Sequence, residues 1–400
     1  MSSILRSHVV NKEFDVRFCY RTHQRYNDGL VAEYSAEERK VFLRPLCILA
    51  NDTLFLRLSL KGWNPWLHKL ALLPFMLMEK GGLYFLWNSI QFLILLLRLR
   101  PEVIHINNGG YPGARSCSQL ALVASFLHQQ KIIYQVNNLA NPPSGWIEKA
   151  IDRRLVTCCQ FITASKLAQH HLRTLRKIPE SRLTQIFNTP PSDPIRRTRA
   201  ELLTEWELPD NTVILSHVAF LSTRKGQRFL LGALRQLKEK YPNLLTNVIL
   251  FLVGSGEDER LLKRLCDEYG LNSFVRFTGY RNDSIEFIAH CDLFFLPSIG
   301  SEDMPLVVLS AMSHGKTIIA SKLGGIEEEI QEGISGILLD PDPTTLETSL
   351  ANVIQTLLSS PNPGFGVMAK LRYDELFSAQ AYEQSLCALY HRLMKERAKT

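Results

Sequence analysis

Apolar, strand-like runs alternate with helix-period segments along almost the whole 400-residue chain, and this alternation restricts the fold more than any other feature. It predicts parallel sheets built from β-α-β units, because consecutive parallel strands need a crossover helix between them. The expected class is therefore α/β, with two Rossmann-like domains. We expect strands at 15–20, 102–106, 131–136, 160–164 and 183–187 in the first domain, and at 213–219, 248–253, 274–278, 293–296, 317–321 and 336–340 in the second.

A polar, proline-rich stretch at 188–199 interrupts this alternation and predicts a linker. We accordingly expect a first domain at 1–190 and a second at 191–377. Residues 378–400 contain a strong helical pattern, which we expect to cross back and pack on the first domain.

Charge is unevenly shared between the halves. Residues 1–190 hold 24 lysines and arginines against 12 aspartates and glutamates, whereas the remainder has a net charge of −5. A basic half predicts an anionic membrane surface or a pyrophosphate-bearing lipid as partner, and a merely solvated basic surface is the alternative. The aromatic-and-basic signatures of nucleic-acid modules are absent, so we expect no nucleic-acid partner.

The most apolar segment, 83–97, is interrupted by polar residues and is too short to span a bilayer. We expect it to be a core helix, with Trp63, Trp66 and 67–78 as a candidate interfacial patch. The eight cysteines show no metal-ligand spacing, which predicts reduced thiols. Together these features predict a cytoplasmic protein with peripheral contact to the inner face of the cytoplasmic membrane.

The stretch 293–330 carries the clearest chemical signal. A buried strand leads into a loop containing Glu302, a helix follows Pro305, and a second strand then ends in the turn Gly324-Gly325. A helix N-terminus binds phosphate, and a carboxylate accepts hydrogen bonds from sugar hydroxyls, so this order predicts a sugar-nucleotide site. Nicotinamide binding is disfavoured, because the third glycine of the dinucleotide pattern is absent and no acidic residue ends the next strand. No Walker A run exists either.

These motifs resemble those of GT-B glycosyltransferases of the retaining family 4, and the resemblance covers nearly the whole chain. It rests on Arg224-Lys225-Gly226, on the runs LFLVGSGED and VRFTGYRND, and on the segment that begins at Glu302. It implies two facing Rossmann-like domains. It further implies a hexosyltransferase, which transfers a hexose-type sugar, with retention, from a nucleoside-diphosphate sugar to a glycan or a polyprenyl- or other lipid-linked acceptor in cell-surface polysaccharide or lipopolysaccharide biosynthesis. No cofactor or metal is expected.

The resemblance also implies residue roles. Lys225 contacts the donor diphosphate, Glu302 contacts the donor sugar, and Asn137 stands where a histidine near the reacting sugar is usual. The other implied donor contacts are Arg224, Gly226, Gly254, Tyr280, Arg281, Asp303, Met304, Leu306 and Ser310, and the implied acceptor-side residues are His105 and Asn138.

The chain departs from the family pattern at several positions. Ser310 replaces a second glutamate, Phe220 replaces an arginine, Pro305 lacks an N–H, and Asn137 cannot titrate. Residues 1–10 already read like the first helix, which suggests an N-terminally shortened chain without the first strand and glycine-rich loop. Two alternatives therefore stay open: a degenerate homologue that binds donor or glycan without turnover, and a nucleotide-sugar hydrolase or epimerase with His105 as its base.

Overall fold

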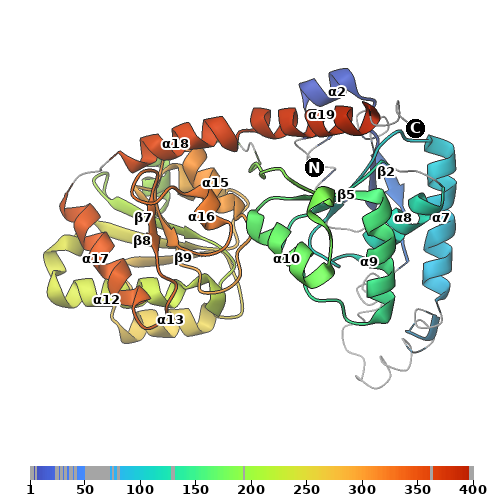
Figure 1. Cartoon of the computed structure of the whole chain (residues 1–400). Coiled ribbons are helices and arrows are strands. Elements are labelled where there is room, and N and C mark those ends of the chain that lie inside the picture. Colours follow the sequence, from blue (N-terminus) through green and yellow to red (C-terminus); the bar gives the residue numbers. More distant parts are fainter. Residues whose placement is uncertain are drawn as a thin grey trace. The chain divides into compact units, whose positions relative to one another are not determined.

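The computed structural model describes residues 7–22, 43–49, 82–127, 131–191, 194–360 and 364–395, together with a few single positions before residue 79. The chain divides into two compact units (Figure 1). The first comprises 1–162, 171–184 and 386–400, and the second comprises 163–170 and 185–385. The domain boundaries expected at residues 190 and 377 stay predictions.

The first unit contains a sheet with strand order β3-β4-β5-β6, in which β3 and β4 pair in parallel, and a parallel pair β1-β2. The crossover helices between these strands are amphipathic or apolar segments, as the sequence pattern predicts. Its elements are α2 (His8–Glu13), β1 (Phe18–Arg21), β2 (Leu43–Leu46), α7 (Leu83–Leu99), β3 (Ile104–Asn108), α8 (Arg115–Phe126), β4 (Ile132–Val136), α9 (Trp146–Cys158), β5 (Cys159–Thr163), α10 (Lys166–Arg176), η1 (Glu180–Arg182) and β6 (Leu183–Gln185).

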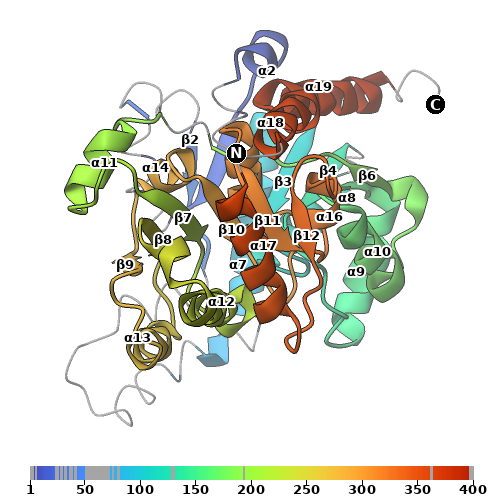
Figure 2. The ribbon, with the colours of Figure 1, turned by 90° about the vertical axis from the view of Figure 1, so that its left-hand side faces the viewer.

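The second unit contains a parallel sheet with strand order β12-β11-β10-β7-β8-β9, visible across Figure 2. Its elements are α11 (Arg199–Glu205), β7 (Val213–Val218), η2 (Thr223–Lys225), α12 (Gln227–Lys240), η3 (Pro242–Leu245), β8 (Val248–Val253), α13 (Glu259–Glu268), β9 (Val275–Gly279), α14 (Ser284–Ala289), β10 (Leu293–Leu296), α15 (Leu306–Ser313), β11 (Thr317–Ser321), α16 (Ile326–Glu329), β12 (Ile337–Leu339), α17 (Leu346–Ser359), α18 (Phe365–Leu376) and the first part of α19 (Ala379–Lys395). The start of α10, up to His170, also belongs to this unit.

Two hydrophobic cores cover the two faces of this sheet. Successive side chains of β8 point to opposite faces, so Phe251 enters one core and Leu250 and Leu252 enter the other. The first core is closed by α14, α15 and α18, and the second by α12, α13 and α17. Burial on both faces explains why the strands read as continuous apolar runs.

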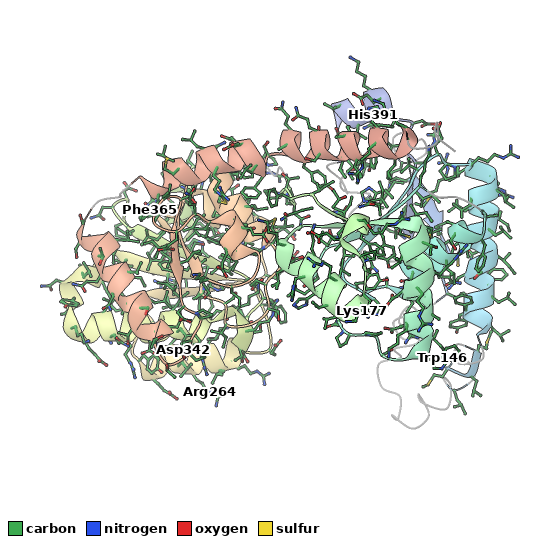
Figure 3. All side chains as sticks on the ribbon, in the orientation of Figure 1. Trp146, Lys177, Arg264, Asp342, Phe365 and His391 are labelled. Carbon is green, nitrogen blue, oxygen red and sulfur yellow. The ribbon has the colours of Figure 1, made fainter. Side chains whose placement is uncertain are left out.

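The end of α19 belongs to the first unit, as predicted for the C-terminal helix. The Tyr390 ring meets Phe14 edge-on at a centroid distance of 5.3 Å, and His391 Nε2 lies 2.7 Å from a carboxylate oxygen of Glu13. Figure 3 shows His391 beside α2, the helix that ends at Glu13.

Predicted strands 248–253, 293–296 and 317–321 match β8, β10 and β11 residue for residue. By contrast, β3 begins two residues later than expected, at Ile104, the first residue to pair with β4. Hydrogen bonding to a neighbouring strand sets this boundary, and a single-sequence pattern does not contain that information.

The prediction that 83–97 is a core helix is wrong. Only a narrow stripe of α7, Tyr84, Asn88, Phe92 and Leu96, is buried, and most of its other apolar side chains are exposed. The high hydrophobicity of this segment predicted a buried helix, but the described residues around α7 cover only one side of it. Trp63 and Trp66 lie outside the described residues. Within the described part of the chain, no helix combines the length and apolar character needed to cross a membrane.

Gly226 joins η2 to α12 with a positive φ of 76°, and a Cβ at this position would overlap the carbonyl oxygen of Pro297. We predict that Gly226→Ala lowers the free energy of unfolding by about 3 kcal/mol, since it adds backbone strain and overpacking. Gly364 is the matched control, because its φ is 81° but no atom lies within 4 Å of the added Cβ. Gly364→Ala should cost about 1 kcal/mol in urea denaturation. Equal losses would contradict the close approach of the two loops.

Candidate functional site

The strand order of the second unit reverses direction between β7 and β10, which are neighbours although they are far apart in sequence. Ligands of open α/β sheets bind at such a switch point, beyond the carboxyl ends of the strands, where the loops diverge. The loop after β7 carries Arg224 and Lys225, and the loop after β10 carries Glu302. Topology therefore brings the predicted cations and carboxylate to one place.

Glu302 is the centre of this site, buried with 6% of its surface exposed. One of its oxygens, Oε1, accepts hydrogen bonds from Lys225 Nζ at 2.5 Å, Ser298 Oγ at 2.7 Å and an Arg224 guanidinium nitrogen at 3.2 Å. Arg224 also donates to the carbonyl of Ser301. Three donors on one buried oxygen fix the position of the carboxylate.

Lys225 is enclosed, whereas the side chain of Arg224 is half-exposed. Burial lowers the pKa of Lys225, and the charge of Glu302 opposes that effect. Beneath the loop, His217 Nε2 donates to the carbonyl of Lys225 at 3.2 Å. Burial lowers the pKa of His217 to about 4, so this histidine is a neutral support for the loop.

A glycine turn supports the loop that contains Glu302. A Cβ on Gly324 would overlap the carbonyl oxygen of Glu302, and one on Gly325 would overlap that of Asp303. The Asp303 carboxylate accepts a hydrogen bond from Ser165 Oγ, which itself accepts one from the Ala168 backbone N–H at the start of α10. The side chain of Asp303 is thus a structural anchor, and its backbone follows the edge of the site.

Glu329 lies beneath this loop with none of its surface exposed, and neither carboxylate oxygen has a hydrogen-bond partner in the described part of the chain. Burial raises the pKa of Glu329 well above its ordinary range, and the nearby carboxylates of Glu302, Asp303 and Glu328 raise it further. Burial without a hydrogen-bond partner among the described residues thus favours the protonated, neutral form of the Glu329 carboxyl group.

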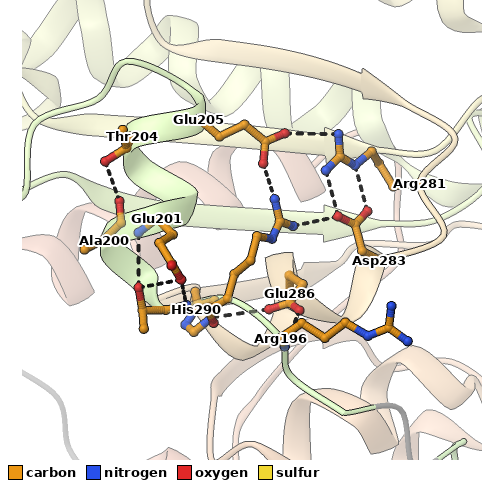
Figure 4. Close-up of polar contacts among 11 residues, drawn as sticks. Arg196, Ala200, Glu201, Thr204, Glu205, Arg281, Asp283, Glu286 and His290 are labelled. Atoms are coloured by element: carbon orange, nitrogen blue, oxygen red, sulfur yellow. Dashed lines mark hydrogen bonds and ion pairs between the residues drawn. The ribbon is translucent and has the colours of Figure 1, made fainter.

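The loop after β9, expected to meet the nucleobase, is held by a closed ring of charges (Figure 4). Arg281 forms two 2.7 Å hydrogen bonds to Asp283 and lies 3.1 Å from Glu205, and Arg197 contacts the same two carboxylates. The Arg281 guanidinium keeps the pKa of Asp283 below its usual range. With the guanidinium engaged, the backbone near Arg281 and the exposed ring of Tyr280 are the groups available to a ligand.

The remaining donor-side residues lie around the same strand ends. Met304 and Ser310 are buried, whereas Leu306, the first residue of α15, is half-exposed. Gly254 follows β8 and packs against the carbonyl of Ala219, and the neighbouring Phe220 is exposed where the family pattern has an arginine. No structural observation assigns a ligand contact to these residues, so their donor roles stay predictions.

Of the expected acceptor-side residues in the first unit, Asn137 and Asn138 directly follow the carboxyl end of β4. His105 does not lie at a strand end as expected, because β3 begins at Ile104 and His105 is its second residue. His105 Nε2 donates to Gln135 Oε1 at 2.9 Å, and its Nδ1 lies 2.7 Å from the Tyr390 hydroxyl. Gln135 in turn donates to Asn137 Oδ1 at 3.0 Å, and Asn137 donates to the carbonyl of Asn108 at 3.1 Å.

Burial of the His105 ring lowers its pKa to about 4. Both ring nitrogens of His105 have partners, Tyr390 and Gln135, so in this structure the histidine holds those side chains in place and is not available for proton transfer. Asn138, by contrast, is exposed, and its Oδ1 accepts from the Leu139 backbone N–H. The acceptor-side roles of His105, Asn137 and Asn138 stay predictions.

Three residues of the site were not identified from the sequence: Ser165, Ser298 and Glu329. The sequence did contain a signal for Ser298, since it lies two residues after a buried strand, in the loop that carries Glu302. Ser165 had none, because it reaches Asp303 from a position 138 residues earlier in the chain.

A family model described as glycosyl transferases group 1 matches residues 198–370, which contain the Glu302 cluster. This part of the chain belongs to that family. The match includes β7 to β12, and hence both loops that meet at Glu302.

Similarity to individual known proteins is partial in sequence and extensive in fold. A D-inositol 3-phosphate glycosyltransferase from Thermobifida fusca is 30% identical over 172 residues, covering 41% of this chain and 38% of that protein. The lipopolysaccharide 1,2-N-acetylglucosaminetransferase of Salmonella typhimurium is 24% identical over 249 residues, covering 59% and 62%. The chain thus spans less than two thirds of either relative.

Among solved structures, Anabaena HepE in complex with UDP superimposes with a TM-score of 0.70, at 16% identity, over 98% of this chain and 95% of that one. At this identity the likeness establishes the fold alone. The predicted GT-B fold class is confirmed by this likeness and by the parallel sheets of the two α/β units.

No group of three or more histidine, cysteine, aspartate or glutamate side chains that could hold a metal ion occurs among the residues that the structure describes. The expectation that catalysis needs no metal stays a prediction.

From the raised pKa of Glu329 we predict that the stability of the folded chain depends on pH. Because its folded pKa is raised, the native state binds more protons than the unfolded state above the ordinary value of 4.5, and stability falls as pH rises toward the folded pKa. Glu329→Gln should remove this slope in melting temperatures measured from about pH 5 to 8. Glu327→Gln, on the exposed side of α16, is the control and should leave the slope unchanged. Parallel curves for wild type and Glu329→Gln would contradict the buried neutral acid.

Proposed function

We propose that this chain is a glycosyltransferase that moves a sugar, with retention of anomeric configuration, from a nucleoside-diphosphate sugar to a hydroxyl of a glycan or lipid-linked acceptor in cell-surface polysaccharide biosynthesis. The observation that carries the proposal is the buried cluster of Glu302, Lys225 and Arg224 at the switch point of the second unit's sheet.

The chemistry of this cluster suits sugar transfer from a diphosphate. When the bond between the anomeric carbon and the diphosphate breaks, negative charge develops on the leaving group, and Lys225 and Arg224 stabilise that charge. The first N–H groups of α15 are unpaired within the helix, and they add to this stabilisation. Only Oε1 of Glu302 is engaged with the two cations and Ser298, so the carboxylate can also accept a hydrogen bond from a sugar hydroxyl.

The similar proteins support the same reading. The T. fusca and Salmonella relatives are named for glycosyl transfer, the latter in lipopolysaccharide, and HepE was solved with UDP. In our proposal the remaining predicted residues complete the donor site: Gly254, Tyr280 and Arg281 near the base, Ser310 near the ribose, and the backbone from Asp303 to Leu306 along the diphosphate and sugar. Asn137 and Asn138 orient the acceptor side.

Loss of Lys225 should weaken nucleotide binding. We predict that Lys225→Ala raises the Kd of the nucleoside diphosphate by at least about tenfold in isothermal titration calorimetry, because a charge-assisted contact to phosphate is lost. Lys263→Ala is the matched control, since Lys263 is a half-exposed lysine of the same unit paired with Glu259. Equal affinities for Lys225→Ala and Lys263→Ala would contradict the diphosphate contact.

Glu302→Gln should separate binding from turnover. The variant keeps the shape of the side chain but removes the charge that pairs with Lys225, so nucleotide affinity should be retained or increased. We expect the release of nucleoside diphosphate from the donor, with alkyl glycosides as acceptors, to fall by about 100-fold or more. Full turnover in a folded Glu302→Gln protein would overturn the role assigned to this carboxylate.

A second candidate is a homologue that binds the donor without turnover. It is favoured by Ser310 and Phe220, which replace a glutamate and an arginine of the family pattern. Saturable nucleotide binding together with no donor consumption by the wild-type chain would support this candidate. The hydrolase or epimerase alternative has less support, since both ring nitrogens of His105 are engaged.

A further inference from the structure

Helix α7 presents a broad apolar face outside the hydrophobic core of the first unit. Phe85, Leu86, Trp87, Ile90, Ile94 and Leu97 are each between 43% and 58% exposed. By helical periodicity all of them except Phe85 lie on the side of α7 opposite the buried stripe through Tyr84, Asn88, Phe92 and Leu96. Figure 3 shows side chains projecting along the whole length of α7.

Scattered exposed apolar residues are ordinary, but a contiguous face along more than three turns of one helix is not. Its removal from water would be strongly favourable, since each of these side chains loses hydration when covered. In α8 and α9 the core-facing apolar residues Ala121, Ala124 and Leu155 are fully buried, and the exposed ones lie at the helix ends, at Phe126, Trp146 and Ile147.

The charge around this face specifies the kind of partner. The sequence of α7, LYFLWNSIQFLILLLRL, contains no acidic residue, and Arg98 and Arg100 lie at its C-terminal end. The first 190 residues carry a net charge of +12. A partner with an apolar interior and an anionic surface is complementary to both properties.

We propose that the outer face of α7 docks on an anionic lipid bilayer, with the helix lying in the plane of the interface. The buried stripe stays packed on the protein, and the outer side chains enter the boundary between headgroups and acyl chains. Arg98 and Arg100 reach lipid phosphates from the end of the helix. This docking places the first unit at the surface where lipid-linked acceptors reside.

Packing explains why α7 lies on the bilayer and does not enter it. Asn88 exchanges hydrogen bonds with the backbone N–H and carbonyl of Leu49 at 2.9 and 3.0 Å, and Gln91 donates to the carbonyl of Cys47 at 2.8 Å. These contacts hold one side of the helix against the protein, so only the outer side is available to lipid.

Vesicle co-sedimentation of the full chain tests the proposal. We expect binding to vesicles of phosphatidylcholine with about 30% phosphatidylglycerol, and weaker binding to phosphatidylcholine alone or at high salt. Replacing Leu86 and Ile90 by glutamine should lower the vesicle partition coefficient at least about tenfold. The matched control replaces Val367 and Leu371 of α18, which have the same spacing and exposures of 65% and 57%, and it should bind as wild type does.

A second variant addresses the charge. Arg98→Gln with Arg100→Gln should reduce the preference for phosphatidylglycerol severalfold and leave binding at high salt unchanged. Either of two results would overturn the proposal: absence of binding by the folded wild-type chain, or wild-type binding by the Leu86 and Ile90 variant. If the wild-type chain forms an oligomer without lipid and the Leu86 and Ile90 variant is monomeric, a second copy of the chain, and not a bilayer, covers this face.

The result is independent of the proposed transferase activity. Leu86 and Ile90 belong to α7 of the first unit, whereas the Glu302 cluster belongs to the second. The variant should therefore keep the nucleotide affinity of wild type, and loss of vesicle binding with intact nucleotide binding separates the two proposals.

Discussion

The ion pair between Lys225 and Glu302 is the interaction on which the rest of the second unit's site depends. The two residues are 77 positions apart in sequence, but their strands, β7 and β10, are neighbours in the sheet. A buried carboxylate is costly unless it is paired and hydrogen-bonded, and here one oxygen receives three donors. The pair is therefore stable only if both loops hold their exact positions.

Close backbone packing provides that precision. Gly226 approaches the carbonyl of Pro297, and the Gly324-Gly325 turn approaches those of Glu302 and Asp303. At these contacts a side chain would force the loops apart. Ser165 donates a hydrogen bond to Asp303 from a third segment, and Glu329 is buried nearby in surroundings that favour its neutral form. The site thus combines rigid backbone with a small number of charges whose partners are fixed, which is the arrangement that electrostatic catalysis requires.

Sequence reasoning predicted the features that follow from local pattern. Buried strands such as β8 and β10 are continuous apolar runs, and their bounds were correct because both faces of the sheet are covered. Glu302 and Lys225 were identified because they stand in loops at strand ends. Ser165 and Glu329 were not, since their importance arises only from tertiary contacts, and α7 was misjudged because hydrophobicity does not reveal which face is covered.

The central claim is that the loops meeting at Glu302 form a site for the diphosphate of a sugar nucleotide. The most direct measurement is a thermal-shift titration of the full chain with UDP, GDP, ADP and dTDP, because a ligand that binds only the native state must stabilise it. The account predicts a saturable rise in melting temperature with one of these nucleotides. A demonstrably folded chain that shows no shift with any of them would contradict it.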